Sequence, residues 1–117
     1  MSLVARELEA HGIATVVLGS ALDTVEYCGV PRFVFTDVPL GNPCGQPYDR
    51  AMQRANLGLA LELLATATYP RTTLWSPYAF PGGDRWRANY ARVDDSNRES
   101  LKAAGEARRA RQHSGSK

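Results

Sequence analysis

Two short apolar runs rich in β-branched residues constrain the fold of this chain more than any other feature. The first, IATVVLG, spans residues 13–19, and the second, PRFVFTDV, spans residues 31–38. Continuous apolar runs of this length are typical of strands buried on both faces of a parallel sheet. Residues 20–29, SALDTVEYCG, are suited to a short helix that ends at a glycine. Strand, helix and strand in this order predict a right-handed βαβ unit.

Helices are predicted on either side of this unit. The first spans residues 2–11, and a longer one runs from Asp49, its predicted N-cap, to Thr68. Leucines cover more than one side of the longer helix, so we expect broad burial, against the sheet and against a neighbour. Gly58, within it, would allow another backbone to approach closely. The predicted fold class is a small three-layer α/β structure with a βαβ-type parallel sheet, this long helix and an extended basic and aromatic tail.

The last third of the chain differs from the rest. Residues 71–86, RTTLWSPYAFPGGDRW, lack a clear period and predict an irregular aromatic arm that lies across another surface. Residues 94–112 are helix-forming, with a capped start at Asp95 or Ser96, but have too few apolar positions to pack alone. The sequence therefore predicts an α/β domain over residues 1–70 and a tail over residues 71–117.

Charge is distributed unevenly between these two parts. The formal net charge is +2, and Lys and Arg outnumber acidic residues only in residues 71–117. The tail aromatics and the RRAR run at residues 108–111 occupy separate stretches, which argues against a nucleic-acid surface. An arm that docks on a protein partner fits better, because Trp, Tyr and Arg are enriched in interface cores.

The sequence also indicates a location. The first residues, MSLVARELEAHG, do not resemble a signal peptide, and no apolar run approaches the roughly 20 residues needed to span a membrane. Two cysteines without an export signal are typical of a reducing compartment. We therefore expect a cytoplasmic protein that does not bind membranes.

The segment DVPLGNPCG, residues 37–45, is the strongest candidate for a functional site. It follows the second predicted strand, at the edge where open α/β sheets bind ligands. Glycine and asparagine before a helix could supply backbone N–H groups to an anion, but the same residues also build ordinary turns. The local chemistry thus leaves two interpretations, a ligand or partner loop and a structural corner. The spacing fits neither common phosphate-binding motif, and we expect no cofactor.

Two side chains of this segment carry chemistry of their own. A thiol at Cys44, near a helix start, could be reactive or could simply fill the loop, whereas Cys28 is expected to be a small core residue. Asp37 could orient a ligand or hydrogen-bond the N–H groups of the loop. Two cysteines with the distant His11 and His113 do not predict a metal site. The sequence contains no recognisable catalytic triad or carboxylate pair.

The order of these elements is similar to that in a known family. VARELEAHGIATVVLGSALDTVEYCGVPRFVFTDVPLGNP, with the leucine-rich helix after it, resembles the C-terminal segment of component B of glycine/sarcosine/betaine reductase. The matching elements are Glu7–Ile13, Phe33–Phe35 and the P-L-G-[ND]-P corner at Pro39–Pro43, within residues 3–68. The resemblance implies that Pro39, Leu40, Gly41, Asn42 and Pro43 line a substrate site, together with Asp37 and Cys44 beside them.

The resemblance also implies a chemistry and a partner. The family uses a selenocysteine or cysteine in a U/C-x-x-C-type motif that attacks a carbon bearing an amino or similar leaving group. That motif comes just before the segment matched here, and neither Cys28 nor Cys44 occupies its place. We therefore expect either a small subunit whose partner chain carries the redox nucleophile, or a truncated relic. The alternatives are a non-catalytic assembly or binding module and a redox role for Cys44 itself.

Overall fold

The computed structural model describes residues 1–90 and 92–114, without side-chain detail at residues 89, 113 and 114. The chain divides into two compact units, Met1–Arg87 and Ala88–Lys117. The first unit contains a sheet, and the second is mostly one helix. The predicted boundary at residue 70 therefore lies inside the sheet-bearing unit.

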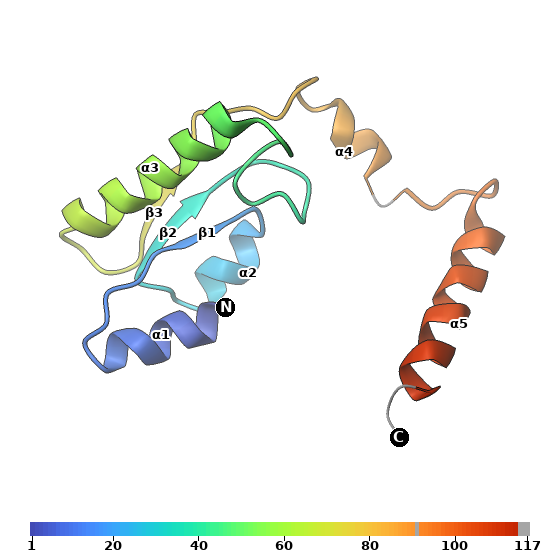
Figure 1. Ribbon diagram of the computed structural model, residues 1–117, viewed down its shortest axis with the longest axis horizontal. Helices are drawn as coiled ribbons and strands as arrows, with labels where there is room; N and C mark the ends of the chain where they lie inside the picture. Colours follow the sequence, from blue (N-terminus) through green and yellow to red (C-terminus); the bar gives the residue numbers. More distant parts are fainter. Residues whose placement is uncertain (91, 115–117) are drawn as a thin grey trace. The chain divides into compact units, whose positions relative to one another are not determined.

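The first unit is a three-stranded parallel sheet with helices (Figure 1). Its helices are α1 (Ser2–Ala10), α2 (Leu22–Tyr27) and α3 (Arg50–Thr66), and its strands are β1 (Val17–Gly19), β2 (Arg32–Phe35) and β3 (Thr72–Trp75). The strands lie in the order β1-β2-β3, with Val17 opposite Phe33 and Arg32 opposite Thr72. The α/β class and the parallel sheet predicted from the two apolar runs are confirmed.

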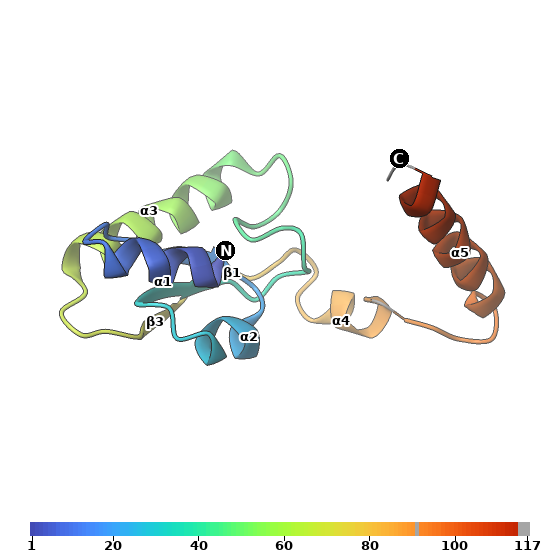
Figure 2. The ribbon, with the colours of Figure 1, turned by 90° about the horizontal axis from the view of Figure 1, so that it is seen from below.

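The alternating side chains of β2 divide the core into two layers. Phe33 and Phe35 face α1 and α2, where they pack with Ala5 and Val25. Val34, which is fully buried, faces α3. Figures 1 and 2 show α2 and α3 on opposite sides of the sheet. Because both crossovers move in the same direction across the sheet, they have opposite hands, so only one is the usual right-handed form.

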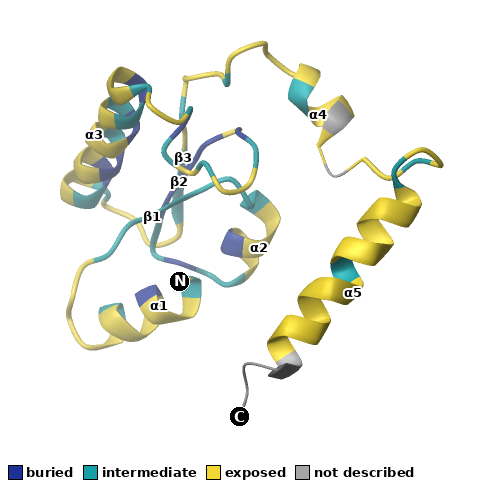
Figure 3. Cartoon of the chain, turned by 45° about the vertical axis from the view of Figure 1, so that its right-hand side comes forward, coloured by how far each residue is buried: buried dark blue, intermediate teal, exposed yellow. Residues whose placement is uncertain are grey.

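Helix α3 begins as the sequence predicts but is buried on one side only. The Asp49 carboxylate accepts a hydrogen bond from the Met52 N–H at 3.0 Å, which is the predicted N-cap. Figure 3 shows buried residues along one side of α3 and exposed residues along the other. Leu57 and Leu61 are 52% and 57% exposed, so the prediction of broad burial is wrong for this chain by itself. Apart from Gly58, its chain neighbours and the nearby backbone of its own helix, no described residue places an atom within 4 Å of a Cβ built on Gly58, so the expected close approach of another backbone is not seen.

The third strand comes from the segment predicted to be an irregular arm. Thr72–Trp75 pairs along its whole length with β2, and Leu74 packs against the α3 layer. The Trp75 ring meets Phe35 edge-on, with the ring centroids 4.6 Å apart. Pairing with a distant strand gives this four-residue segment its structure, so local sequence patterns did not reveal it.

The second unit carries the predicted tail helix. Helix α4 (Arg85–Asn89) crosses the boundary between the units, and α5 (Arg98–Ser114) lies within the second. The turn before α5 is organised by Asp94, which accepts from the N–H and hydroxyl of Ser96, and by Asn97, which accepts from the Asp94 N–H at 2.9 Å. The helix therefore starts after the predicted caps. Within the described residues, no helix is both long and apolar enough to cross a membrane.

Candidate functional site

All three strands end at the same edge of the sheet, here called the carboxyl edge. Because the strands are parallel, the segments that follow β2 and β3 leave the sheet there together. The candidate loop, residues 37–45, follows β2, and Ser76 follows β3. The sequence thus placed the loop correctly at the edge where parallel sheets bind ligands.

Thr36 attaches the loop to the sheet. It is fully buried, and its backbone N–H donates to the Gly19 carbonyl at 2.8 Å. Its hydroxyl donates to the Pro43 carbonyl at 2.7 Å and lies 3.2 Å from the Gly19 carbonyl. The loop leaves β2 at Asp37. Pro43, near the other end of the loop, is bonded to Thr36, the residue just before Asp37. The corner is therefore closed into a compact turn.

Asn56, one of the buried residues of α3, holds the next residue of the loop. Its side-chain Nδ2 donates to the Cys44 carbonyl at 2.9 Å, and its Oδ1 accepts from the Ser76 hydroxyl at 2.5 Å. The Ser76 N–H in turn donates to the Phe35 carbonyl at 2.8 Å. Asn56 is completely buried, so these bonds replace those that its amide makes with water in the unfolded chain. One amide thus joins the loop, α3 and the segment after β3.

Two glycines shape the loop. Gly41 and Gly45 have φ values of 96° and 112°, which residues with a side chain rarely adopt. Space is open around Gly41, whereas a Cβ on Gly45 would lie 2.7 Å from the Met52 sulfur. Glycine is therefore required at position 45 for two reasons: the backbone has a positive φ, and Met52 of α3 leaves no room for a Cβ.

The loop lines a hollow at the surface. Gly41, Asn42, Pro43 and Cys44 line a cavity of about 370 Å³, which Gly45, Pro47 and Gln53 complete. Of the predicted site residues, Asp37, Pro39 and Leu40 lie outside this hollow, and Leu40 is 57% exposed. The structure thus brings together residues 41–44 of the predicted set. Their backbone and side chains offer a small, shaped surface without a charged group.

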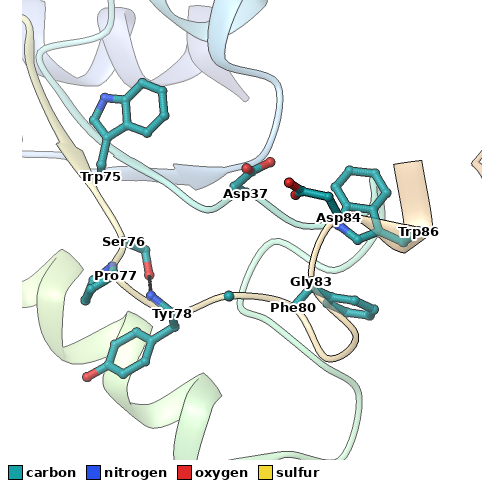
Figure 4. Close-up of a pocket in the computed structure, with 10 residues that line it drawn as sticks. Asp37, Trp75, Ser76, Pro77, Tyr78, Phe80, Gly83, Asp84 and Trp86 are labelled. Carbon is teal, nitrogen blue, oxygen red and sulfur yellow. Dashed lines mark hydrogen bonds between the residues drawn. The ribbon is translucent and has the colours of Figure 1, made fainter. Parts of the chain in front are cut away.

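Asp37 belongs to a second cavity, of about 220 Å³, which is lined mainly by the segment that follows β3 (Figure 4). Its exposed carboxylate accepts a hydrogen bond from the Arg87 guanidinium, which also lies 3.4 Å from Asp84. The hydrogen bond that Arg87 donates to Asp37 raises the pKa of Arg87 above its usual value. Figure 4 shows Asp37 and Asp84 on the same side of this cavity, while the ring of Tyr78 points away from Asp37. Among the described hydrogen bonds, the Asp37 carboxylate binds Arg87 and none of the loop N–H groups, so the predicted bonding of the loop by Asp37 is not seen.

The cysteines do not form a pair. Cys28 follows α2, which runs back from the carboxyl edge, so Cys28 lies toward the opposite edge of the sheet from Cys44. Both are free and half-buried. Within residues 1–90 and 92–114, no group of three or more His, Cys, Asp or Glu side chains is placed to hold a metal ion. Chemistry that needs two neighbouring thiols requires a second source of sulfur or selenium.

Four residues that organise this edge were missing from the sequence prediction: Thr36, Asn56, Ser76 and Arg87. Asn56 could be recognised only once the buried side of α3 is known, because a buried polar side chain needs internal partners. Ser76 and Arg87 gave no signal, since their positions depend on the unpredicted strand β3.

Comparison of the chain with protein-family models, with curated proteins and with solved structures found no match.

Proposed function

We propose that this chain is a small α/β subunit of a reductase complex related to glycine/sarcosine/betaine reductase component B. In this proposal, loop 37–45 lines a substrate site whose redox nucleophile comes from a partner chain. One observation carries the proposal: the corner motif Pro39–Pro43 forms a closed loop at the carboxyl edge, fixed by two buried side chains. A loop fixed in this way keeps its shape without a ligand, as a positioning element requires.

The reaction would be the reductive cleavage of a carbon–nitrogen or related bond. A thiolate or selenolate on the partner attacks the substrate carbon and forms a sulfur– or selenium–carbon bond as the bond to nitrogen breaks. The amine leaves with the bonding electron pair and takes up a proton, while the carbon stays bonded to the partner's sulfur or selenium. A second thiol of the partner's motif would then attack that sulfur or selenium and break its bond to carbon. The carbon would keep the bonding pair and take up a proton, and the two partner groups would be oxidised to a disulfide or a selenenylsulfide. Residues 41–44 would hold the substrate against the nucleophile, because correct orientation alone lowers a barrier substantially.

Two features of the first unit support a partner. Its two thiols lie toward opposite edges of the sheet and cannot act as one redox pair. Leu57 and Leu61, one turn apart on α3, are more than half exposed and could contribute to an interface.

The test is reconstitution. The chain is co-expressed with a neighbouring reading frame that encodes a Cys- or selenocysteine-containing redox motif, and the purified material is assayed for co-purification and for amine release from glycine, sarcosine and betaine. Gly41→Ala is expected to lower amine release and leave co-purification unchanged. Gly12→Ala is the matched control, because Gly12 also has a positive φ and open space around it but lies at the end of α1. Absence of both association and amine release would refute the proposal.

A non-catalytic assembly module is the second candidate. The buried bonds of Thr36 and Asn56 would serve a purely structural corner equally well. This candidate predicts stable co-purification with a partner, together with full activity of the assembled complex containing Gly41→Ala.

Cys44 as the redox thiol is a third candidate. It is favoured because Cys44 lines the hollow beside residues 41–43. Cys44→Ser decides this case in the same assay. Full amine release by that variant would exclude it, whereas loss of release with association retained would support it.

A further inference from the structure

The segment after β3 returns to the sheet that it has just left. Residues 77–87, here called the strap, follow Ser76. The Ser76 N–H donates to the Phe35 carbonyl of the sheet, and its hydroxyl donates to Asn56 of α3. The strap ends at Arg87, which binds Asp37 at the end of β2. Between these two ends it borders the cavity of about 220 Å³. The strap therefore spans the carboxyl edge and is fixed at both ends.

A glycine turn directs the strap back. Gly82 and Gly83 have φ values of 83° and 59°, and the Gly83 N–H donates to the Phe80 carbonyl at 3.0 Å. The Arg85 side chain donates to the Gly82 carbonyl at 3.2 Å, which joins this turn to the start of α4. The turn thus brings Arg87 to the side of the cavity where Asp37 lies.

The two ends of the strap differ in strength. At the Ser76 end, the hydrogen bonds involve the buried Asn56 and the backbone of the sheet. At the Arg87 end, the side chains of Arg87 and Asp37 are 41% and 47% exposed, and the Trp86 ring lies 5.0 Å from the guanidinium. Exposed ion pairs are weak and are screened by salt. The Arg87 end is therefore the one that releases first.

We propose that the strap is a lid over the carboxyl edge and that the Arg87–Asp37 pair is its latch. When the pair breaks, the strap swings about its fixed Ser76 end and opens the cavity beside Asp37. An exposed pair of this kind shifts the balance between closed and open forms by about 1.5- to 5-fold. A latch of this strength favours the closed form only modestly, so the lid still opens frequently.

Only one part of this proposal, the statement of what the lid covers, rests on the proposed function. Asp37 lies two residues before the corner motif, so opening would expose the Asp37 end of loop 37–45 to a substrate or a partner chain. The latch itself concerns only this chain, and it is tested without a partner.

Hydrogen–deuterium exchange of the full chain tests the latch. Asp37→Asn and Arg87→Gln are each expected to speed exchange of strap amides by about 1.5- to 5-fold, and the double variant should add little to either one. The charge-swapped variant, Asp37→Arg with Arg87→Asp, should restore slow exchange. Arg54→Gln, which removes an exposed charge from α3, is the control and should leave the strap unchanged. Amides of β2 monitor global folding and should exchange equally slowly in every variant.

Salt supplies an independent arm of the same experiment. Raising ionic strength from low to about 0.5 M should bring wild-type strap exchange close to that of Arg87→Gln and leave that variant unaffected. Strap exchange that is the same in wild type, Asp37→Asn and Arg87→Gln at low salt would overturn the latch. That result would leave the proposed function intact, since association and amine release are measured separately.

Discussion

Thr36 and Asn56 are the two fully buried polar side chains among the described residues, and both are bonded to the candidate loop. They bind the carbonyl groups of consecutive residues, Pro43 and Cys44. A buried polar group without a partner is costly, so each of these side chains strongly favours the one loop conformation that satisfies it. The shape of the loop is therefore determined from beneath, while its outer surface is left free for function.

Replacement of Asn56 by alanine should destabilise the first unit by about 2–4 kcal/mol, because the Cys44 carbonyl and the Ser76 hydroxyl both lose their partner. Urea unfolding followed by circular dichroism measures this change. Gln53→Ala, one turn earlier on α3, removes only the bond from Gln53 to the Gln46 carbonyl and should cost less than about 1.5 kcal/mol. Equal losses in the two variants would contradict a special role for Asn56.

Replacement of Gly45 by alanine should also destabilise the chain, by about 1–3 kcal/mol. The positive φ strains any residue with a side chain, and the added methyl group would meet the Met52 sulfur. Thermal unfolding gives the size of the loss. Gly41→Ala carries the first of these two costs without the second, so it should be the milder variant. A larger loss for Gly41→Ala would show that the contact with Met52 relaxes freely.

Sequence alone gave part of this site. Proline and glycine at the end of an apolar run indicate a corner wherever they occur, so residues 39–43 could be found locally. Asn56 looks the same in sequence whether it faces solvent or the core. Arg87 lies 50 residues from Asp37, and only the fold brings the two together. Residues that act through distant contacts are therefore the ones that sequence reasoning missed.

At the scale of elements, α3 shows why leucine content did not reveal its buried side. Its buried residues, Met52, Asn56, Ala60 and Leu63, follow the spacing of one helix face, and that face includes a single leucine. Leu57 and Leu61 lie on another face and are exposed. The sequence predicted the helix and its N-cap correctly, since both are local properties. The choice of face was decided by the shape of the sheet beneath it.

Gly58 lies on the exposed part of α3, where alanine should be the better residue. Gly58→Ala is expected to stabilise the isolated chain by about 0.5–1 kcal/mol, because alanine loses less conformational freedom in a helix and nothing nearby opposes its methyl group. Urea unfolding provides the measurement. If the same variant weakens association with a partner chain, Gly58 serves an interface; destabilisation of the isolated chain would instead contradict the open space seen here.

Glu9, near the end of α1, should make the free energy of unfolding depend on pH in the acidic range. Burial raises the pKa of Glu9, but hydrogen bonds from the Thr15 N–H and hydroxyl and the charge of Arg32 outweigh it, so the pKa lies below its usual value. A lowered pKa means that the stabilisation is complete above about pH 4.3, the value for an unfolded chain, and is lost as pH falls through the lower folded value. Glu9→Gln should therefore be less stable than wild type at pH 7.

Urea midpoints of wild type and Glu9→Gln between pH 7 and pH 3 check this dependence. The gap between the two proteins should narrow below about pH 4. Glu7→Gln, on the exposed side of α1, is the control and should show a smaller gap at pH 7. A gap that stays constant down to pH 3 would show that Glu9 acts without its charge.

At the scale of the whole molecule, the sheet decides where the folding unit ends. Strand β3 contributes Leu74 to one core layer, and Trp75 packs on Phe35. Ser76 then satisfies Asn56, and Arg87 closes the strap. Each of these contacts involves a residue that follows position 70, where the change in composition had suggested a boundary. Composition reports which residues are apolar, whereas the boundary depends on which segments pair.

Two truncated chains separate these boundaries. Residues 1–87 should unfold cooperatively in urea with nearly the midpoint of the full chain, because the unit Met1–Arg87 keeps its sheet, both core layers and the strap. Residues 1–70 should lack a cooperative transition, because removal of β3 exposes the edge of β2 and leaves the buried Asn56 without Ser76. Circular dichroism during urea titration distinguishes the two. A cooperative transition for residues 1–70 at the midpoint of the full chain would show that β3 is an addition to a domain that ends where its long helix ends.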